Sequence, residues 1–352
     1  MTPFPLHLNP DVWLNILIGK KVSNFKNFCY GALLLLFTAV SLSSLVSCDN
    51  SSSIAESAPE PQLEPLDPTP RLVIMSAFDA EMNMLLNEAE IQHTYIIAGK
   101  IYRTAKLAGN DVVMVLCGIS MVNAVLTTQS AIDHFRVTGI IFSGIGAGVN
   151  PDLHIGDVTI PGQWEQYQEQ VFAKRIADDK WDPKALESVF PDPVVNYGMM
   201  YPKAVVIVTQ EYGQQDTKEY KFWFKAASEM LDVVWRIADS VVLRNCTRDG
   251  ECLMHYPKIV VDGNGVSGQT FVNNKAYREW VWDSFRADTL DMETAGVAHV
   301  AYVNHIPFVA FRSLSDLAGG GSGENEISIF FQLAADNSSR LLIRFLEEWP
   351  NR

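Results

Sequence analysis

The chain has 352 residues, of which 48% are hydrophobic and 19% charged, which is an ordinary globular composition. This length is enough for one large domain or two small ones. The formal net charge is −14, and no cluster of lysines and arginines occurs beyond the first 70 residues. A nucleic acid partner requires a basic face, so we expect no nucleic acid binding and an acidic surface that favours solubility.

The first 47 residues show the features of a targeting segment in the usual order. Basic residues come first, at Lys20, Lys21 and Lys26, and the apolar run 30–40 that follows is too short to span a bilayer comfortably. Small residues then precede a cysteine in Leu45-Val46-Ser47-Cys48. This order resembles the signal peptide of a bacterial lipoprotein, in which the cysteine becomes the lipidated first residue. An uncleaved anchor helix with an incidental cysteine is the alternative.

The resemblance implies that Cys48 is the lipidation site and that lipid anchors the protein in the bacterial cell envelope, on the periplasmic or extracellular face. Asp49 and Asn50 resemble the signal that retains lipoproteins in the inner membrane. Residues 50–70 are rich in Ser, Pro, Glu and Ala, which predicts a disordered tether. We therefore expect a signal peptide at 1–47, a lipidated cysteine and linker at 48–70, and a domain at 71–352.

From Arg71 onward, strand patterns alternate with amphipathic helical patterns. Strands are expected at 71–76, 111–117, 138–143, 204–209, 258–261 and 307–311. Helices are expected at 121–135, 219–241, 275–285, 294–303 and 327–348. This alternation predicts a single three-layer α/β domain with a central mixed, largely parallel sheet flanked by helices. The irregular segment 163–202 is expected to be an insertion or a long loop over the site.

The remaining cysteines predict one buried thiol and one short disulfide. Cys117 ends an apolar strand and is expected to be buried. Cys246 and Cys252 flank a polar turn, and in an exported domain this spacing predicts a disulfide. No second cysteine or histidine pair accompanies them, so we expect no metal site, and a histidine such as His299 is expected to pack or cap.

Three acidic residues follow predicted strands, where ligands of open α/β sheets bind. Glu81 begins the helix after the first strand, Glu293 opens the helix at 294–303, and Asp316 follows the strand at 307–311. We expect Glu293 to stay ionised, because the helix dipole favours a carboxylate in the first turn. The alternative is that these acids only cap helices or begin a loop.

A glycine-rich segment, Ser143 to Gly148, follows the strand at 138–143 and allows a ligand to approach the backbone closely. Its spacing is G-x-G-x-G, and Asn150-Pro151 stands where a dinucleotide-binding loop leads into a helix. No acid in a following strand takes the place of a ribose-binding residue, so we expect no dinucleotide and no other cofactor.

Seven short motifs occur in order along the domain, at 77–82 (A-x-x-x-E-M), 117–120 (C-G-I-S), 143–148 (S-G-I-G-A-G), 155–158 (I-G-D-V), 267–273 (S-G-x-x-F-V-N), 291–295 (D-M-E-T-A) and 312–316 (R-S-L-S-D). Together they resemble the nucleoside phosphorylase/nucleosidase superfamily, particularly the methylthioadenosine/S-adenosylhomocysteine nucleosidases. The resemblance extends from about Arg71 to the C-terminus. Residues 316–322, residues 81–83 and the tryptophan-containing insertion also resemble the plant bark and vegetative storage proteins of this superfamily.

The resemblance implies a role for each matching residue. Glu81 matches the carboxylate that activates the attacking water, and Asp316 matches the acid that protonates purine N7, oriented by Ser315. Breaking an N-glycosidic bond requires such an acid and such a base. The residues that match substrate contacts are Glu293 at the ribose 2′- and 3′-hydroxyls, Met292 at the sugar, Phe271 stacked on the base, the Val272 backbone at the adenine edge, and Arg312 near the water.

The choice between phosphate and water as nucleophile depends on the residues around Gly144. Related phosphorylases hold phosphate with an arginine two residues before this glycine, where this chain has Phe142, and near the first strand the chain offers Asp79 and Glu81. Carboxylates repel a phosphate dianion, so water is the expected nucleophile. Cys117 departs from the family pattern, because many nucleosidases carry a serine there.

The sequence therefore predicts a purine nucleosidase, an N-ribosyl hydrolase that releases free base and sugar from methylthioadenosine, S-adenosylhomocysteine, adenosine or a similar nucleoside. A phosphate-dependent purine nucleoside phosphorylase and a non-catalytic nucleoside-binding or storage protein are the alternatives. The resemblance implies a homodimer with a small-molecule purine nucleoside as ligand and with membrane contact through the lipid anchor only.

Overall fold

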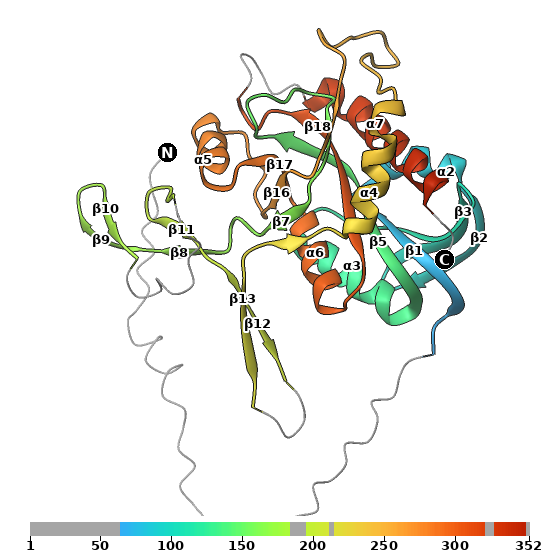
Figure 1. Cartoon of the computed structure of the whole chain (residues 1–352), viewed down its shortest axis with the longest axis horizontal. Helices are drawn as coiled ribbons and strands as arrows, with labels where there is room; N and C mark the ends of the chain where they lie inside the picture. Colours follow the sequence, from blue (N-terminus) through green and yellow to red (C-terminus); the bar gives the residue numbers. More distant parts are fainter. Residues whose placement is uncertain (1–63, 184–194, 211–214, 321–326, 350–352) are drawn as a thin grey trace, which may run out of the picture. The chain divides into compact units, whose positions relative to one another are not determined.

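A computed structural model describes residues 64–183, 195–210, 215–320 and 327–349, and its central feature is a large mixed sheet (Figure 1). The strands of this sheet are β1 (Asp67–Ser76), β2 (Glu90–Ile97), β3 (Lys100–Leu107), β4 (Asn110–Leu116), β5 (Phe135–Gly148), β6 (Val158–Ile160), β7 (Gln163–Glu165), β14 (Phe224–Lys225), β15 (Ile259–Val261), β16 (Asn264–Ser267), β17 (Ala287–Asp291) and β18 (Phe308–Asp316). The spatial order is β14-β7-β16-β17-β5-β1-β4-β3-β2, and β18 pairs with β5 and β6. Because β1 and β18 run parallel to β5 while β17 runs antiparallel to it, the predicted mixed sheet is confirmed.

Helices cover both faces of the sheet and complete the predicted three layers. They are α2 (Asp79–Glu88), α3 (Met121–His134), α4 (Ser228–Ile237), α5 (Lys275–Phe285), α6 (Thr294–Val303) and α7 (Ile327–Glu348), with a short 3₁₀ turn, η2 (Ala238–Ser240). Alternate residues of β1 point to opposite faces: Leu72 and Ile74 pack with α2, α4 and α7, whereas Val73 and Met75 pack with α3 and α6. Each face therefore buries its own apolar layer.

Three predicted helices, α5, α6 and α7, have the bounds that the sequence pattern indicates, and α3 ends one residue early. The prediction of one helix over 219–241 is wrong. Its first residues form β13 (Thr217–Lys221), which pairs in an antiparallel hairpin with β12 (Val205–Thr209), and only α4 with η2 is helical. Strand pairing across the hairpin outweighs the local helical pattern.

The segment 163–202 has more structure than the predicted loop. Its β7 joins the central sheet, and the other strands form small antiparallel pairs, β8 (Gln170–Phe172) with β11 (Met200–Pro202) and β9 (Lys174–Ala177) with β10 (Lys180–Asp182). The predicted strand at 204–209 exists as β12, but it belongs to a separate hairpin and not to the central sheet. The folded region also begins earlier than Arg71, since β1 starts at Asp67.

The glycine-rich segment continues β5 and is not a loop. A Cβ atom at Gly146 would lie 2.6 Å from the Thr289 hydroxyl and 3.2 Å from the Leu290 carbonyl oxygen, so only glycine lets β5 pass this close to β17. The close approach brings the ends of β5, β17 and β18 together, and β17 and β18 end there in Asp291 and Asp316.

Candidate active site

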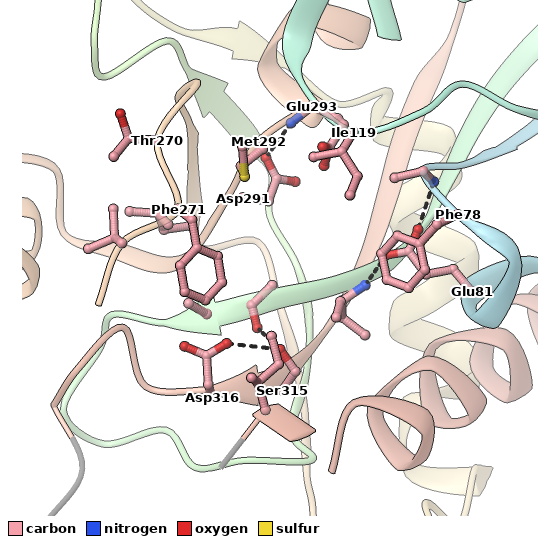
Figure 2. Close-up of a pocket in the computed structure, with 17 residues that line it drawn as sticks. Phe78, Glu81, Ile119, Thr270, Phe271, Asp291, Met292, Glu293, Ser315 and Asp316 are labelled. Atoms are coloured by element: carbon pink, nitrogen blue, oxygen red, sulfur yellow. Dashed lines mark hydrogen bonds between the residues drawn. The ribbon is translucent and has the colours of Figure 1, made fainter. Parts of the chain in front are cut away.

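A cavity of about 250 Å³ lies at the carboxyl ends of β17 and β18, beside loops that follow β1, β4 and β16 (Figure 2). Its volume is close to the lower end of the range of roughly 300–1,000 Å³ typical of small-molecule sites. The structure brings seven of the nine predicted catalytic and substrate-binding residues to its wall. These are Glu81, Phe271, Val272, Met292, Glu293, Ser315 and Asp316.

The other two predicted residues, Gly144 and Arg312, lie behind this wall. Arg312 is 1% exposed, and its guanidinium stacks 4.3 Å from the centre of the Phe142 ring. A Cβ atom at Gly144 would lie 2.7 Å from Arg312 Nη1 and would also collide with the Glu81 carboxylate. Gly144 therefore makes room for an arginine and an acid that meet over the backbone of β5.

Glu81 is a buried acid in the first turn of α2. Its Oε2 accepts a hydrogen bond from the backbone N–H of Ala77 at 2.7 Å, and its Oε1 accepts one from Ile145 at 2.8 Å. Burial raises the pKa of Glu81 above its ordinary value, although Arg312 and these N–H groups oppose the shift. The two bonds fix the carboxyl group and leave it lone pairs for a further partner.

Asp316, the last residue of β18, has donors on both carboxyl oxygens. The Ala318 N–H donates to Oδ1 at 2.9 Å, and the Ser315 hydroxyl lies 3.0 Å from Oδ2 and 3.3 Å from the carbonyl oxygen of Gly146. One hydroxyl proton serves only one acceptor. When it goes to Gly146, the Ser315 oxygen can accept a hydrogen bond from a protonated Asp316 carboxyl, so this arrangement can hold Asp316 as an acid.

Glu293 occupies the N-cap position of α6, but its side chain makes no capping hydrogen bond. Its Oε1 accepts the Ser120 N–H at 2.8 Å, and its Oε2 lies 3.4 Å from Arg312 Nη2. Burial raises the pKa of Glu293 to about 7, with Arg312 opposing the shift and Asp291 and Glu81 adding to it. Burial among other acids therefore opposes the effect of the helix dipole, which favours an ionised Glu293.

Ser120 holds its N–H on Glu293 through an unusual backbone conformation. Its φ is 94°, in the region that favours glycine, and Gly118 just before it has φ 85°. Such strain in a non-glycine residue persists where the surroundings enforce it, which is common at functional sites. The loop before α3 is therefore shaped to place one N–H on a pocket acid.

Asp291 is the site residue that sequence reasoning missed. Its Oδ2 lies 2.7 Å from Arg312 Nε, and its Oδ1 accepts the N–H groups of Glu293 and Thr294 at 3.2 Å, so it caps α6. A signal exists in the sequence, since an aspartate just before an apolar helical run is a typical helix cap.

The cavity has an aromatic side and a carboxylate side. Figure 2 shows the Phe271 ring near Asp316, with Glu81 on the other side of the cavity. The Phe271 side chain is 57% exposed, so its face is open to a flat ligand. None of the described residues of the segment 163–202 lines the cavity, and Gln168 Oε1 accepts the N–H of Gln269, next to the lining residue Thr270, at 2.6 Å. Residues 184–194 of this segment lie outside the described residues, so its position over the site stays a prediction.

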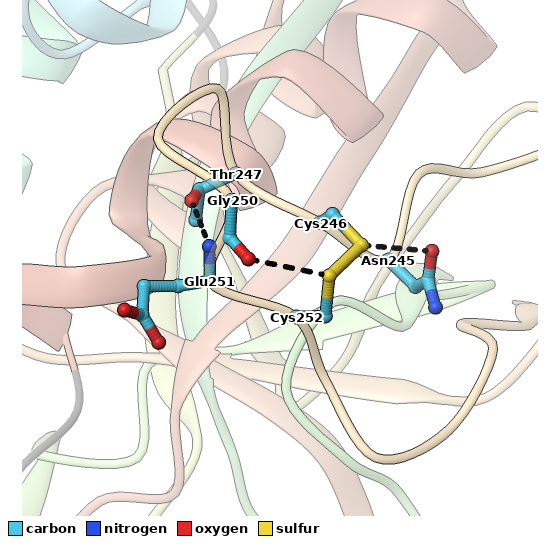
Figure 3. Close-up of a disulfide and its surroundings, with 6 residues drawn as sticks. All are labelled: Asn245, Cys246, Thr247, Gly250, Glu251 and Cys252. Atoms are coloured by element: carbon cyan, nitrogen blue, oxygen red, sulfur yellow. Dashed lines mark hydrogen bonds between the residues drawn. A yellow bond between two sulfur atoms is a disulfide. The ribbon is translucent and has the colours of Figure 1, made fainter.

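The described cysteines are one free thiol near the site and one disulfide away from it. Cys117 is a free, buried thiol, and burial raises its pKa, with Glu293 and Glu81 adding to the shift. Away from the cavity, Cys246 and Cys252 are joined in a disulfide (Figure 3), whose loop contacts α7 through Arg248 and Asp336. Within the described residues, no group of three or more His, Cys, Asp or Glu side chains is placed to hold a metal.

Comparisons with known proteins agree with this geometry. A family model described as the phosphorylase superfamily matches residues 71–347. Bark storage protein B of Populus deltoides is 27% identical over 259 residues, which cover 72% of this chain and 79% of that protein. The 5′-methylthioadenosine/S-adenosylhomocysteine nucleosidase of Bacillus thuringiensis (strain Al Hakam) is 25% identical over 281 residues, covering 79% of this chain and 99% of the enzyme.

A solved structure shares the fold. It is a mutant of the Helicobacter pylori 5′-methylthioadenosine/S-adenosylhomocysteine nucleosidase with 5′-methylthioadenosine in its active site. The two folds superpose with a TM-score of 0.57 at 20% identity, covering 79% of this chain and 99% of the other. At this identity the match establishes the fold, which is the one that the sequence resemblance implied.

The predicted lipid-anchored location in the bacterial cell envelope is wrong by these comparisons. The matched relatives are named as nucleosidases and storage proteins, and none of the names given above describes a lipoprotein or an envelope protein. Residues 1–63, with the predicted signal peptide and Cys48, lie outside the described residues. Among the described helices, none combines the length and the apolar character needed to cross a membrane.

Proposed function

The chain belongs to the phosphorylase superfamily, a superfamily of nucleoside-processing proteins, and from this premise we propose that it is a purine nucleosidase. The proposed reaction is hydrolysis of the N-glycosidic bond of an adenosine-type nucleoside, such as methylthioadenosine, S-adenosylhomocysteine or adenosine, to free base and sugar. One observation carries the proposal: acids from α2, β17 and β18 line one cavity, and its described lining residues include no lysine, arginine or histidine.

This charge distribution favours water over phosphate as the nucleophile. The nearest cation, Arg312, lies behind the wall and is shared by Asp291, Glu293 and Glu81 at 2.7, 3.4 and 3.6 Å. A phosphate dianion in the cavity would face these carboxylates without a free positive charge, and the repulsion is strong in a buried site. A neutral water molecule meets no such penalty.

The proposed mechanism uses two acids in opposite roles. Protonated Asp316 gives its proton to purine N7, the C1′–N9 bond breaks, and its electron pair leaves with the base. Water forms the new C1′–O bond and transfers a proton to the Glu81 carboxylate, so one proton leaves the protein and one returns. The Ser315 hydroxyl, which can accept a hydrogen bond from the protonated Asp316 carboxyl, and the raised pKa of Glu81 support these assignments.

The remaining lining residues suit the parts of the nucleoside. We propose that the Phe271 face stacks on the base and that the Val272 backbone binds the adenine edge, since both residues line the cavity and Phe271 lies near Asp316 in Figure 2. Glu293 would accept hydrogen bonds from the ribose 2′- and 3′-hydroxyls, and Met292 beside it would pack on the sugar.

A product assay tests the proposal. The purified protein is incubated with adenosine and with methylthioadenosine, with and without phosphate, and released reducing sugar and free base are quantified. We expect equal rates in both buffers. Cleavage that requires phosphate would establish the phosphorylase alternative, and nucleoside binding without cleavage would establish a binding or storage protein.

We also propose that the active form is a homodimer, as the family resemblance implies. Support comes from α3, which exposes Val122 and Leu126 four residues apart, just after Ile119, a residue that lines the cavity. These side chains are 56%, 63% and 52% exposed, respectively, and form an apolar strip beside the site. Light scattering should give twice the chain mass for the wild type and a monomer for Leu126→Glu.

A further inference from the structure

The buried cluster around Arg312 contains more acids than cations. Three carboxyl groups, those of Asp291, Glu293 and Glu81, surround one guanidinium, and all four side chains are at most 6% exposed. Arg312 Nη1 also donates to the Ile145 carbonyl oxygen at 2.7 Å. Burial alone would lower the pKa of Arg312, but the three acids raise it, so the guanidinium stays charged. One positive charge cannot compensate three carboxylates in a buried site.

Asp291 makes the shortest ionic contact with the Arg312 guanidinium. Its 2.7 Å contact to Arg312 Nε is shorter than those of Glu293 and Glu81 by 0.7 and 0.9 Å. Its two oxygens also receive the hydroxyls of Ser267 and Thr294, besides the two N–H groups that it caps on α6. Hydrogen bonds of this number stabilise a carboxylate.

We propose that Asp291 is a positioning residue that takes the charge of Arg312, and thereby leaves Glu81 free for the attacking water and Glu293 free for the ribose hydroxyls. This inference rests on the proposed function. It assigns Asp291 no contact with the reacting atoms, since its oxygens are occupied by Arg312, Ser267 and Thr294.

The groups around the two glutamates show what the loss of Asp291 would do. Glu293 faces Arg312, Asp291, Glu81 and the Ser120 N–H, and the charge of Asp291 is among the causes that raise its pKa. Glu81 faces Arg312, the N–H groups of Ala77 and Ile145, and the buried Cys117 thiol. Without Asp291, the guanidinium is released to both glutamates, and each then ionises more readily.

The test compares pH profiles of kcat/KM for the wild type and Asp291→Asn. The acidic limb reports the carboxyl groups that must be ionised in the free enzyme. We expect the limb of Asp291→Asn to move to lower pH by about one unit, which is the usual size of such a charge effect. Asp291→Ser, which keeps an oxygen to cap α6, should move the limb in the same direction.

The matched control is Asp67→Asn. Asp67 is also a buried aspartate bonded to a buried arginine, Arg71, but it lies at the start of β1 and outside the cavity wall. Asp67→Asn should lower the melting temperature and leave the acidic limb in place. The proposal is overturned if the acidic limb stays in place in both Asp291 variants, or if it moves equally far in Asp67→Asn. It is also overturned if neither Asp291 variant folds.

A second readout separates this inference from the proposed function. Adenosine binding is measured against pH by equilibrium dialysis in the Asp316→Asn background, where no turnover is expected, with and without Asp291→Asn. If the wild type cleaves no nucleoside, the proposed function fails, yet a shifted pH dependence of binding would still support the role of Asp291. If the wild type hydrolyses nucleosides and neither profile shifts, only the inference fails.

Discussion

Arg71 and Arg312 are both buried and both bind an aspartate, but they lie at opposite ends of the central sheet. At the start of β1, Arg71 Nη2 meets Asp67 at 2.6 Å, and a second acid, Asp111, is 31% exposed and has its own lysine partner. Burial alone would raise the pKa of Asp67, but hydrogen bonds from Thr69 and Arg71 outweigh it and lower this pKa. At this end of the sheet each acid therefore has a cation of its own.

The carboxyl end has more buried acids than cations, which suits the proposed chemistry. Arg312 is shared among three buried acids, and the pKa values of two of them, Glu81 and Glu293, are raised. The comparison shows that one kind of ion pair can serve stability or chemistry. The number of acids per cation, together with access to a cavity, decides which of the two it serves.

The largest expected effect is on turnover. Glu81→Gln and Asp316→Asn should each lower kcat by about 10²–10⁴-fold, because each removes a general base or acid. Both variants should keep the wild-type melting temperature within a few degrees and should bind adenosine. Steady-state kinetics and calorimetric binding check this, and near-wild-type hydrolysis by both would show that the roles are misassigned.

The two arginines should differ in their importance for folding. Arg312→Met leaves three buried acids without a cation and should cost about 3–5 kcal/mol of unfolding free energy. Arg71→Met should cost less, about 1–3 kcal/mol, because it leaves only one buried acid without its cation and the second acid, Asp111, reaches solvent. Urea denaturation at pH 7 measures both. Equal losses would mean that the acid count does not distinguish the two ends.

Glu165 extends the comparison to a buried acid without any cation in contact. It ends β7, it is fully buried, and within the described residues neither oxygen has a hydrogen bond of normal geometry. Burial raises its pKa well above the ordinary value, and Glu169 adds to the shift. A carboxyl group whose pKa is higher in the folded state contributes its full stability at pH values below its pKa in the unfolded chain. This contribution is lost as the pH rises through its pKa in the folded protein.

Glu165→Gln should therefore stabilise the protein at pH 8, by about 1–3 kcal/mol, and have little effect at pH 4. Thermal unfolding across this pH range measures the difference. The exposed Glu279 of α5, replaced by Gln, is the control and should show no such trend. A destabilised Glu165→Gln at pH 8 would mean that the carboxylate has a partner in solution.

The smallest effect concerns the loop that binds Glu293. Ser120→Gly should raise the unfolding free energy by about 1 kcal/mol, because glycine adopts a φ of 94° without strain. The N–H that Glu293 accepts is retained, so kcat/KM should stay within about twofold of wild type. Ser120→Ala is the control, since it keeps the strained backbone and should show no gain. A loss of stability in Ser120→Gly would show that the serine side chain matters more than its backbone.

Much of the fold was readable because its helices are amphipathic and its strands apolar. The helices α5, α6 and α7 keep their predicted bounds. The hairpin of β2 and β3 was missed because β2 is largely exposed and lacks a hydrophobic pattern. The stretch 219–241 was misjudged because its first residues gain their structure from pairing with β12, which no local pattern records.

The site was predicted to a similar extent. Motif order led to Glu81, Glu293 and Asp316, which do line one cavity. The pKa of Glu293 was beyond sequence reasoning, since a sequence shows the helix start but not the burial that raises this pKa to about 7. Asp291 was missed because its importance lies in its contacts with Arg312 and Ser267, from two other strands.

The measurement that tests the central claim most directly is isotope transfer from water. Adenosine or methylthioadenosine is cleaved in ¹⁸O-labelled water that contains phosphate, and the sugar product is analysed by mass spectrometry. If water is the nucleophile beside Glu81, one labelled oxygen appears at C1 of a free sugar in a single turnover. A sugar 1-phosphate, or intact nucleoside recovered after prolonged incubation, would contradict the account.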